Sequence, residues 1–307
     1  MKNLLLLCLS VLLLNLHAIS QQRMIIDSDS ANEVDDVIAI ARALMSDQVE
    51  VIGLTSAQWN HEGSWMRNTV EESREINDRI LRIMDREDIP SLLGSEQSVG
   101  VRYENGSVFQ WSMTARESEA ADFIAEKALA VPEGEKLTVL VMGPLTNVAS
   151  ALLRTPAIAS KLSVHYIGTL YDPELDVWNK NEFNTRNDLN ALDAVLNAQD
   201  LELHIMPANA TDKLRFLNKS SMDRLEGKPG ICSLILERWK KMVPQPNDEW
   251  GWIMWDLALI HAIIHPDWVE KKMTTTPPEN RQRQISVYTA VDHGKMIADF
   301  WEHFGCD

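Results

Sequence analysis

Apolar and polar positions define two kinds of segment that alternate along the chain. Short apolar runs, as in buried strands, cover residues 23–29, 49–57, 89–95, 136–144, 161–169, 201–208 and 284–291. Apolar residues at helical spacing mark segments 35–47, 68–87, 117–131, 145–156, 188–199 and 251–264. Residues 103–115 are predicted to be irregular. The alternation predicts an α/β fold, in which helices cover both faces of a mainly parallel, Rossmann-like sheet.

The N-terminal segment differs from the rest of the chain. A single lysine precedes the apolar stretch 4–14, and the small residues Ala18 and Ser20 follow it. This pattern is typical of a secretory signal peptide cleaved after Ser20, and the stretch is too short to span a membrane. We therefore predict that residues 1–20 are removed. Residues 21–307 would form one domain that is secreted or periplasmic and is not membrane-bound.

Composition and charge exclude one class of partner, but they say little about the chemistry of the protein. With 45% hydrophobic and 24% charged residues, the chain is ordinary for a globular protein. Its formal net charge of −16 argues against nucleic acid as a partner, because nucleic-acid binders usually present a basic face. Beyond the signal peptide the cysteines are Cys232 and Cys306. Export would permit a disulfide between them, but two cysteines do not establish one.

Acidic residues crowd the segment that follows the first predicted strand: Asp27, Asp29, Glu33, Asp35 and Asp36. Like charges this close repel one another, and helix capping would explain only one or two of them. A helix-loop-helix calcium loop fails at Ala31 and Ile38, and no later Gly-Asp-x-x-x-Asp segment supports a phosphatase with an aspartate nucleophile. A hard divalent cation bound by several carboxylates remains. Calcium fits best, because an irregular loop can supply flexible coordination.

Two further polar segments follow predicted strands, at 56–60 and 143–147. Ligands of open parallel sheets bind beyond the carboxyl ends of the strands. These segments and the acidic cluster are therefore expected to meet at one edge of the sheet and to form one site.

Four segments together resemble the nucleoside hydrolase family. The Asp-x-Asp…Asp-Asp cluster resembles its signature, and VLVMGPLTNVASAL resembles its second hallmark, a strand followed by Gly-Pro-Leu-Thr-Asn and a helix. NEFNTRNDLNALDAV resembles its Glu-Phe-Asn segment, and MWDLALIHAIIHPDW resembles its late helix with a metal-binding aspartate. The four occur in the family's order over residues 24–268. The resemblance implies the family's single-domain α/β fold and cleavage of N-glycosidic bonds.

The resemblance also implies roles for individual residues. Asp29 would be both a calcium ligand and the general base, and Asp27 would orient the neighbouring acids. Asp36, the backbone carbonyl of Thr146 and Asp256 would be the other calcium ligands. The ribose would be bound by Asp35, Asn60, Glu182 and Asn184.

Some of these residues also have simpler interpretations. Taken alone, Thr146 and Asn147 are typical of a helix N-cap, and the segment 182–184 is typical of a turn or helix cap. Trp255 could pack beside Trp252 within a helix. These interpretations stay open at the level of the sequence.

The first loop departs from the family's pattern. It is two residues longer than usual, with SANEV in place of a Pro-Gly linker. The extra length leaves open whether Asp27 or Asp29 is the base. Asn32 within this loop could add a contact to the ribose.

The residue before Asp256 is a second departure. Many members have a leaving-group His there, and this chain has Trp255. A Trp resembles the purine-preferring branch, in which indole stacking raises the basicity of the leaving base. A second stacking Trp is expected from Trp111, or else from Trp59 or Trp65. His61 is not expected to replace the missing acid.

Together these features predict a secreted, calcium-dependent hydrolase that cleaves the N-glycosidic bond of purine ribonucleosides. The alternatives are a hydrolase of another glycosidic substrate and a non-catalytic sugar-binding module, because a fold alone does not determine function. The partner would be a small nucleoside or sugar. Resemblance to the family further implies a homodimer or homotetramer.

Overall fold

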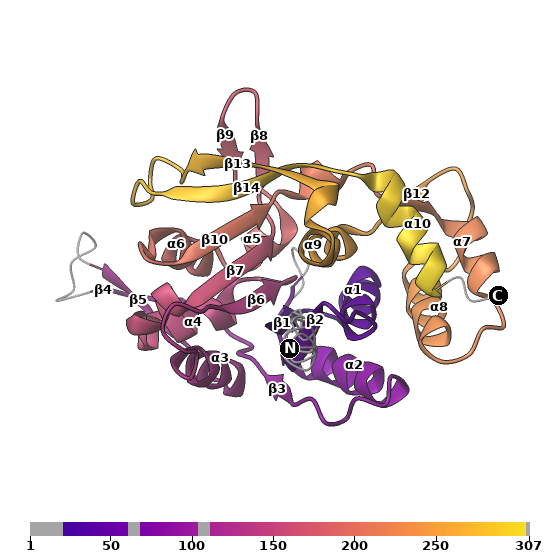
Figure 1. Cartoon of the computed structure of the whole chain (residues 1–307), viewed down its shortest axis with the longest axis horizontal. Helices are drawn as coiled ribbons and strands as arrows, with labels where there is room; N and C mark the ends of the chain where they lie inside the picture. Colours follow the sequence, from indigo (N-terminus) through magenta and orange to yellow (C-terminus); the bar gives the residue numbers. More distant parts are fainter. Residues whose placement is uncertain (1–20, 61–67, 104–110, 305–307) are drawn as a thin grey trace, which may run out of the picture.

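The computed structural model describes residues 21–60, 68–103 and 111–304. An eight-stranded sheet runs through its centre (Figure 1). In spatial order its strands are β13 (Val269–Thr275), β14 (Gln284–Val291), β10 (Glu202–Met206), β7 (Leu162–Ile167), β6 (Leu137–Val141), β1 (Gln22–Ser28), β2 (Val49–Ser56) and β3 (Ser91–Leu93). Neighbouring strands pair in parallel except β13 and β14, which are antiparallel. The predicted mainly parallel sheet is confirmed.

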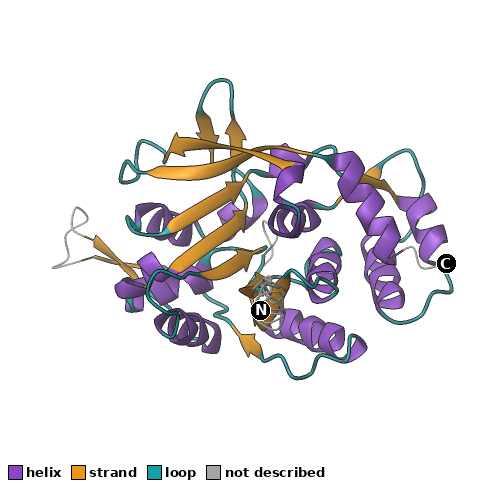
Figure 2. Ribbon diagram, viewed as in Figure 1, coloured by secondary structure: helices purple, strands orange, loops and turns teal. Residues whose placement is uncertain are grey.

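Helices cover both faces of the sheet (Figure 2). One face packs against α3 (Glu119–Leu129), α4 (Thr146–Arg154) and α6 (Leu189–Asn197). The other packs against α1 (Asp35–Leu44), α2 (Thr69–Ile83) and α9 (Trp255–Ile264), while α8 (Ile231–Met242) packs on α1 and α10 (His293–Phe304) packs on α9. Side chains of β1 alternate between the two cores, with Ile25 on the first face and Met24 and Ile26 on the second. Burial on both faces explains why these strands are continuous apolar runs in the sequence.

Smaller elements complete the described chain. They are α5 (Phe183–Asn187), α7 (Asn218–Leu225), the 3-10 helices Pro156–Lys161, Ala208–Thr211 and Pro266–Trp268, and the strand pairs β4 (Gly100–Tyr103) with β5 (Trp111–Thr114), β8 (Leu170–Asp172) with β9 (Val177–Asn179), and β11 (Arg215–Leu217) with β12 (Gly251–Ile253).

Two predictions are corrected here. Part of the segment expected to be irregular forms β5, and the helix expected at 251–264 begins only at Trp255. The residues before it form β12, because they pair with β11, a partner that no local pattern reveals.

The strand order reverses beside β1. The chain passes from β1 to β2 and β3 on one side of it, and β6, β7, β10 and β14 follow one another on the other side. In an open α/β sheet the crevice at such a reversal is the usual position of a ligand. The carboxyl ends of β1 and β6 define that crevice here.

A buried charge cluster ties α1, α9 and α10 together. Arg42 of α1 donates two hydrogen bonds to the carboxylate of Asp299 of α10, at 2.7 and 2.9 Å. His261 of α9 lies 2.8 Å from the same carboxylate through its Nε2. Arg42 and His261 belong to the last turns of their helices, and the first turns of both helices carry acidic residues. The cluster therefore fixes how these two helices pack, at the ends opposite their acidic turns.

The signal peptide and Cys306 lie outside the described residues, so cleavage and a disulfide stay predictions. Cys232 is buried in α8, with its Sγ 3.2 Å from the carbonyl oxygen of Phe304. Over the part of the chain that the structure describes, the helices lack the combined length and apolar character that a membrane crossing needs.

Candidate functional site

Strand β1 brings two aspartates to the crevice, and they have different surroundings. Asp27 is completely buried, and Thr55 Oγ1 and Asn147 Nδ2 both donate to its Oδ1, at 2.6 and 2.8 Å. Asp29, one residue past the end of β1, lines a pocket. A Cβ at Gly143 would lie 3.2 Å from the carboxyl carbon of Asp29, so the glycine after β6 leaves room for this side chain. Of the two aspartates, Asp29 is the one that a ligand in the pocket can reach.

The loop at 30–34 is anchored by two distant helices. Ser30 Oγ lies 2.8 Å from Asn77 Oδ1 of α2, and Arg238 of α8 donates to the carbonyl oxygen of Ala31. Both contacts hold the first half of the loop. Its second half forms part of the pocket wall.

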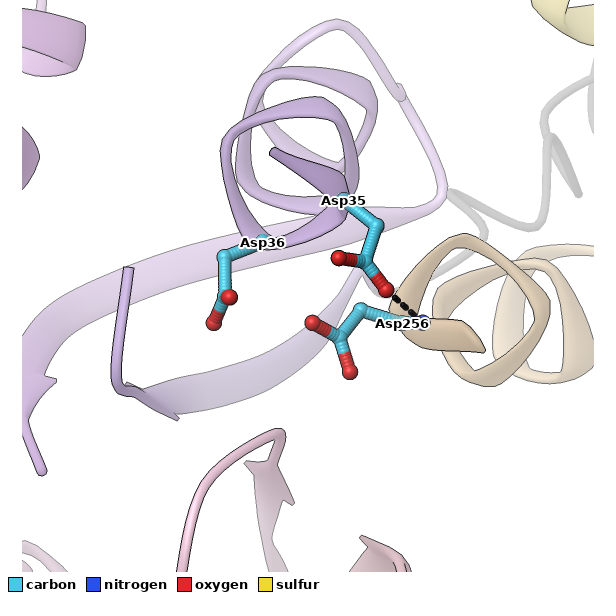
Figure 3. Close-up of side chains that lie close together, drawn as sticks. All are labelled: Asp35, Asp36 and Asp256. Atoms are coloured by element: carbon cyan, nitrogen blue, oxygen red, sulfur yellow. Dashed lines mark hydrogen bonds between the residues drawn. The ribbon is translucent and has the colours of Figure 1, made fainter. Parts of the chain in front are cut away.

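Three buried carboxylates from two helices meet in this pocket (Figure 3). Asp35 and Asp36 lie in the first turn of α1, and Asp256 lies in the first turn of α9. One oxygen from each carboxylate lies within 4.8 Å of the other two. The backbone N–H of Asp256 donates to Asp35 Oδ2 at 3.2 Å, which joins the two helices directly. The positive ends of two helix dipoles offset part of the repulsion among the acids.

Burial makes these acids difficult to ionise. Loss of hydration raises the pKa of Asp29, Asp36 and Asp256 well above the usual aspartate value, and the neighbouring carboxylates raise it further. Burial also raises the pKa of Asp35 to about 6, although backbone N–H groups act in the opposite direction. Within the described ranges, no hydrogen-bond donor reaches Asp29 Oδ2, Asp35 Oδ1 or Asp36 Oδ1.

Buried carboxylate oxygens without donors fit a hard divalent cation. Carboxylates are the preferred ligands of such ions, and a positive charge would stabilise the ionised form of all these acids at once. Asp35, Asp36 and Asp256 lie close enough together to hold one cation, and Asp29 lines the same pocket. A buried acidic group that could bind a metal is therefore present, and it contains two of the predicted ligands, Asp36 and Asp256. The assignment of the individual ligands stays a prediction.

The pocket brings together most of the residues that the sequence indicates. It is lined by Asp29, Asn32, Glu33, Asp35, Asp36, Met142, Ile167, Glu182, Phe183, Asn184, Ala208, Trp255 and Asp256. The side-chain amide of Asn184 donates to the carbonyl oxygens of Met142 and Ile167, at 2.9 and 3.1 Å. Met142 is the first residue after β6, and Ile167 is the last residue of β7. The amide therefore connects the carboxyl ends of two neighbouring strands.

Thr146 and Asn60 are not among the described residues that line the pocket. Thr146 begins α4 and its hydroxyl donates to Asp188 Oδ2 at 2.8 Å, so a cation could use only its backbone carbonyl. The backbone N–H of Asn60 donates to Asn187 Oδ1 at 2.8 Å. Calcium binding by Thr146 and ribose binding by Asn60 stay predictions.

The structure describes only some of the candidates for the second stacking tryptophan. Trp59 is buried in the hydrophobic core and is not among the described residues that line the pocket, so stacking by Trp59 stays a prediction. Trp111 lies on β5, but its side chain is outside the described part of the structure. Trp65 and His61 also lie outside the described residues.

One cap interpretation is confirmed and another is wrong. Glu182 is the N-cap of α5, where its carboxylate accepts from the N–H groups of Asn184 and Thr185, both at 3.0 Å. Because Glu182 also lines the pocket, it can hold the helix and still face a ligand. At α4 the N-cap position belongs to Leu145, whose side chain cannot cap. Asn147 instead supports the buried aspartate at the end of β1.

Several lining residues had no predicted role. Met142 and Ile167 lie at the ends of two adjacent strands, so the rule that ligands bind beyond strand ends could have found them. Phe183 stands beside two predicted ribose-binding residues. Glu33 belongs to the acidic cluster, but nothing in its spacing showed which way it faces.

Comparison with known proteins identifies the family. The sequence profile described as "Inosine-uridine preferring nucleoside hydrolase" matches residues 24–306. The chain belongs to this family. This nucleoside hydrolase is 24% identical over 290 residues to the probable uridine nucleosidase 1 of Oryza sativa subsp. japonica. The aligned region covers 90% of this chain and 86% of the rice protein.

Solved structures share the hydrolase's fold. A plant nucleoside hydrolase superposes with a TM-score of 0.68 at 18% identity, covering 93% of this chain and 99% of that chain. An inosine-guanosine nucleoside hydrolase superposes with a TM-score of 0.66 at 19% identity, covering 91% and 97%. The predicted nucleoside hydrolase fold is confirmed.

Membership of the family defines the reaction class. The protein is a hydrolase that acts on the N-glycosidic bond of nucleosides. Nucleoside hydrolases generally depend on a metal, in agreement with the buried acidic group in the pocket. Membership thus favours an enzyme over a non-catalytic sugar-binding module.

Proposed function

We propose that this nucleoside hydrolase uses calcium to cleave purine ribonucleosides into base and ribose. The observation that carries the proposal is the composition of one pocket. The pocket is lined by acids suited to a cation, by the ribose-binding candidates Glu182 and Asn184, and by the indole of Trp255. A nucleoside has three matching parts, which are a reacting carbon, sugar hydroxyls and a planar base.

The acids would perform the chemistry at the sugar. A calcium ion held by Asp29, Asp36 and Asp256 would lower the pKa of the attacking water. Asp29 would accept a proton from the attacking water as the oxygen of the water bonds to the anomeric carbon, and the electrons of the N-glycosidic bond would leave with the base. Positive charge develops on the sugar as the bond to the base breaks, and the buried carboxylates stabilise this charge in a site of low polarisability.

Two side chains would orient the ribose. Both N–H groups of the Asn184 amide are used by backbone carbonyls, so its Oδ1 is the atom that remains to accept a sugar hydroxyl. The Glu182 carboxylate is fixed by backbone N–H groups and retains lone pairs for another hydroxyl. Positioning by groups that are already fixed avoids an entropic cost when the substrate binds.

Trp255 supports the choice of purines. It lines the pocket, and its ring meets Trp252 edge to face at 6.4 Å between centroids. This packing fixes the indole, and a larger base gains more from stacking on a fixed aromatic surface. The similar rice protein is named a probable uridine nucleosidase, so uridine is the competitor to test.

Residues 21–307 should release ribose from inosine, guanosine and adenosine with calcium present, at a higher kcat/KM than from uridine. Chelation should abolish the release and added calcium should restore it. Reducing-sugar detection of free ribose measures each rate. A higher kcat/KM for uridine would contradict the purine preference. Release from none of the four nucleosides, with cleavage of another glycoside, would support the alternative substrate class.

We also propose that the enzyme acts after export, as a homodimer or homotetramer. The composition of residues 1–20 supports export, and resemblance to the family supports the assembly. Native mass spectrometry of protein collected from a secreting host tests both points. The expected mass is two or four chains that each begin at Gln21. A chain that retains residues 1–20, or a single-chain mass, would contradict the corresponding part.

A further inference from the structure

Glu33 has no part in the proposed reaction, yet it faces the substrate pocket. It lies in the second half of the loop that α2 and α8 anchor from behind, and it lines the pocket together with Trp255. The side chain is half-buried, so its carboxyl group is neither in bulk water nor within the core. Such a position needs a hydrogen-bonding partner for the carboxyl oxygens.

The neighbours of Glu33 leave it an unused acceptor. The charged groups that act on it most strongly are other acids, namely Asp29, Asp35 and Glu182. The nearby donor is the indole N–H of Trp252, which lowers the pKa of Glu33 but does not reach it with full hydrogen-bond geometry. A donor that enters the pocket would therefore meet a carboxyl oxygen with spare capacity.

The aromatic side chains show which part of a substrate would reach Glu33. Trp252 lies beside Glu33 and packs edge to face on Trp255. The ribose-binding candidates and the metal-binding acids line the same pocket. A base stacked on Trp255 would turn one edge toward the side of the pocket that carries Trp252 and Glu33.

We propose that Glu33 accepts a hydrogen bond from an N–H group on the edge of the leaving base. The inference rests on the proposed function and adds a specificity residue to it. A carboxyl oxygen accepts a hydrogen bond whether the group is ionised or protonated, so the contact does not depend on titration. The preferred substrates are then nucleosides whose base carries such an N–H, such as inosine with its N1–H.

The test compares a leaving group that has an N–H with one that has none. Inosine and p-nitrophenyl β-D-ribofuranoside share the ribose, but nitrophenolate offers no N–H. Glu33→Ala should lower kcat/KM for inosine about 10- to 100-fold, the cost of leaving the N–H of the base without a partner in a buried site. For the nitrophenyl riboside the change should stay below about threefold. Glu33→Gln, which keeps an acceptor oxygen, should recover part of the inosine activity.

Methylated inosine gives an independent measure. Wild-type enzyme should prefer inosine to 1-methylinosine, and Glu33→Ala should lose most of that preference. Glu249→Gln is the matched control, because it removes an exposed carboxylate close to β12 outside the pocket and should change neither ratio. The calcium-induced rise in melting temperature verifies that each variant folds and binds the ion.

Two results would overturn the assignment. Equal losses on inosine and on the nitrophenyl riboside would mean that Glu33 serves the ribose or the cation. Unchanged kinetics on both would mean that it contacts no part of the substrate. Failure of the proposed function looks different, because wild-type enzyme would then cleave neither compound.

Discussion

Asp29→Asn should lower kcat by about 10³-fold, the range expected when a general base is removed. The reason is its position: Asp29 is the aspartate at the end of β1 that lines the pocket, and its Oδ2 has no donor among the residues that the structure describes. Loss of a cation ligand adds to the effect. Steady-state rates of ribose release from inosine at saturating calcium measure it.

The same substitution should stabilise the metal-free protein. Burial and neighbouring acids raise the pKa of Asp29 in the folded state. An acid with a raised folded pKa opposes folding at any pH above its unfolded pKa, and the penalty grows until the pH reaches the folded value. A neutral asparagine removes this penalty at pH 7. Urea unfolding with chelator present should therefore give a higher midpoint for Asp29→Asn than for wild type.

Asp27→Asn is the matched control, since it makes the same chemical change two positions earlier. The hydroxyl of Thr55 and the amide of Asn147 donate to a single oxygen of Asp27, and asparagine keeps one acceptor oxygen there. Its kcat should fall by about 10- to 100-fold, less than for Asp29→Asn, because a residue that orients the neighbouring acids does not itself take part in the reaction. If Asp27→Asn lost as much activity as Asp29→Asn, the base would have to be reassigned. A variant Asp29→Asn with more than a tenth of wild-type kcat would exclude Asp29 as the base.

The second large effect concerns stability. Asp299→Ala should lower the free energy of unfolding by about 3–5 kcal/mol, the cost of leaving one partner of a buried ion pair uncompensated. The Arg42 and Asp299 side chains are only 6% and 7% exposed, and His261 bonds the same carboxylate. Loss of Asp299 would leave the Arg42 charge buried between helices. Urea unfolding followed by circular dichroism measures the change.

An exposed ion pair in the same molecule provides the comparison. Arg79 of α2 and Glu237 of α8 make a similar two-bonded contact, but their side chains are 39% and 58% exposed. Glu237→Ala should cost at most about 1 kcal/mol, because water solvates the remaining charge. Similar losses in both variants would show that burial does not set the strength of these contacts.

The sequence by itself determined the frame of the fold. Strands such as β6 are buried on both faces, so their apolar runs are unambiguous, and helices such as α2 show their spacing clearly. It failed at β12, whose residues look helical but pair with β11. A strand of three residues has too little periodicity to compete with the helix that follows it.

The sequence also located the acidic cluster that lines the pocket. Carboxylates repel one another when crowded, so a cluster like that at 27–36 indicates a cation without any coordinates. It did not determine which aspartate faces the substrate. That choice depends on Gly143, which makes room for Asp29, and on Asn147, which holds Asp27 in the interior.

Only the tertiary structure decided how the pocket is completed. Asp256 donates to Asp35 from a helix more than two hundred residues away, and no local rule relates the two. Glu33 faces the pocket because Asn77 and Arg238 hold the first half of its loop. Local patterns report the burial and charge of a residue's own segment. The direction in which a loop residue points is set by contacts with distant parts of the chain, and those exist only once the chain has folded.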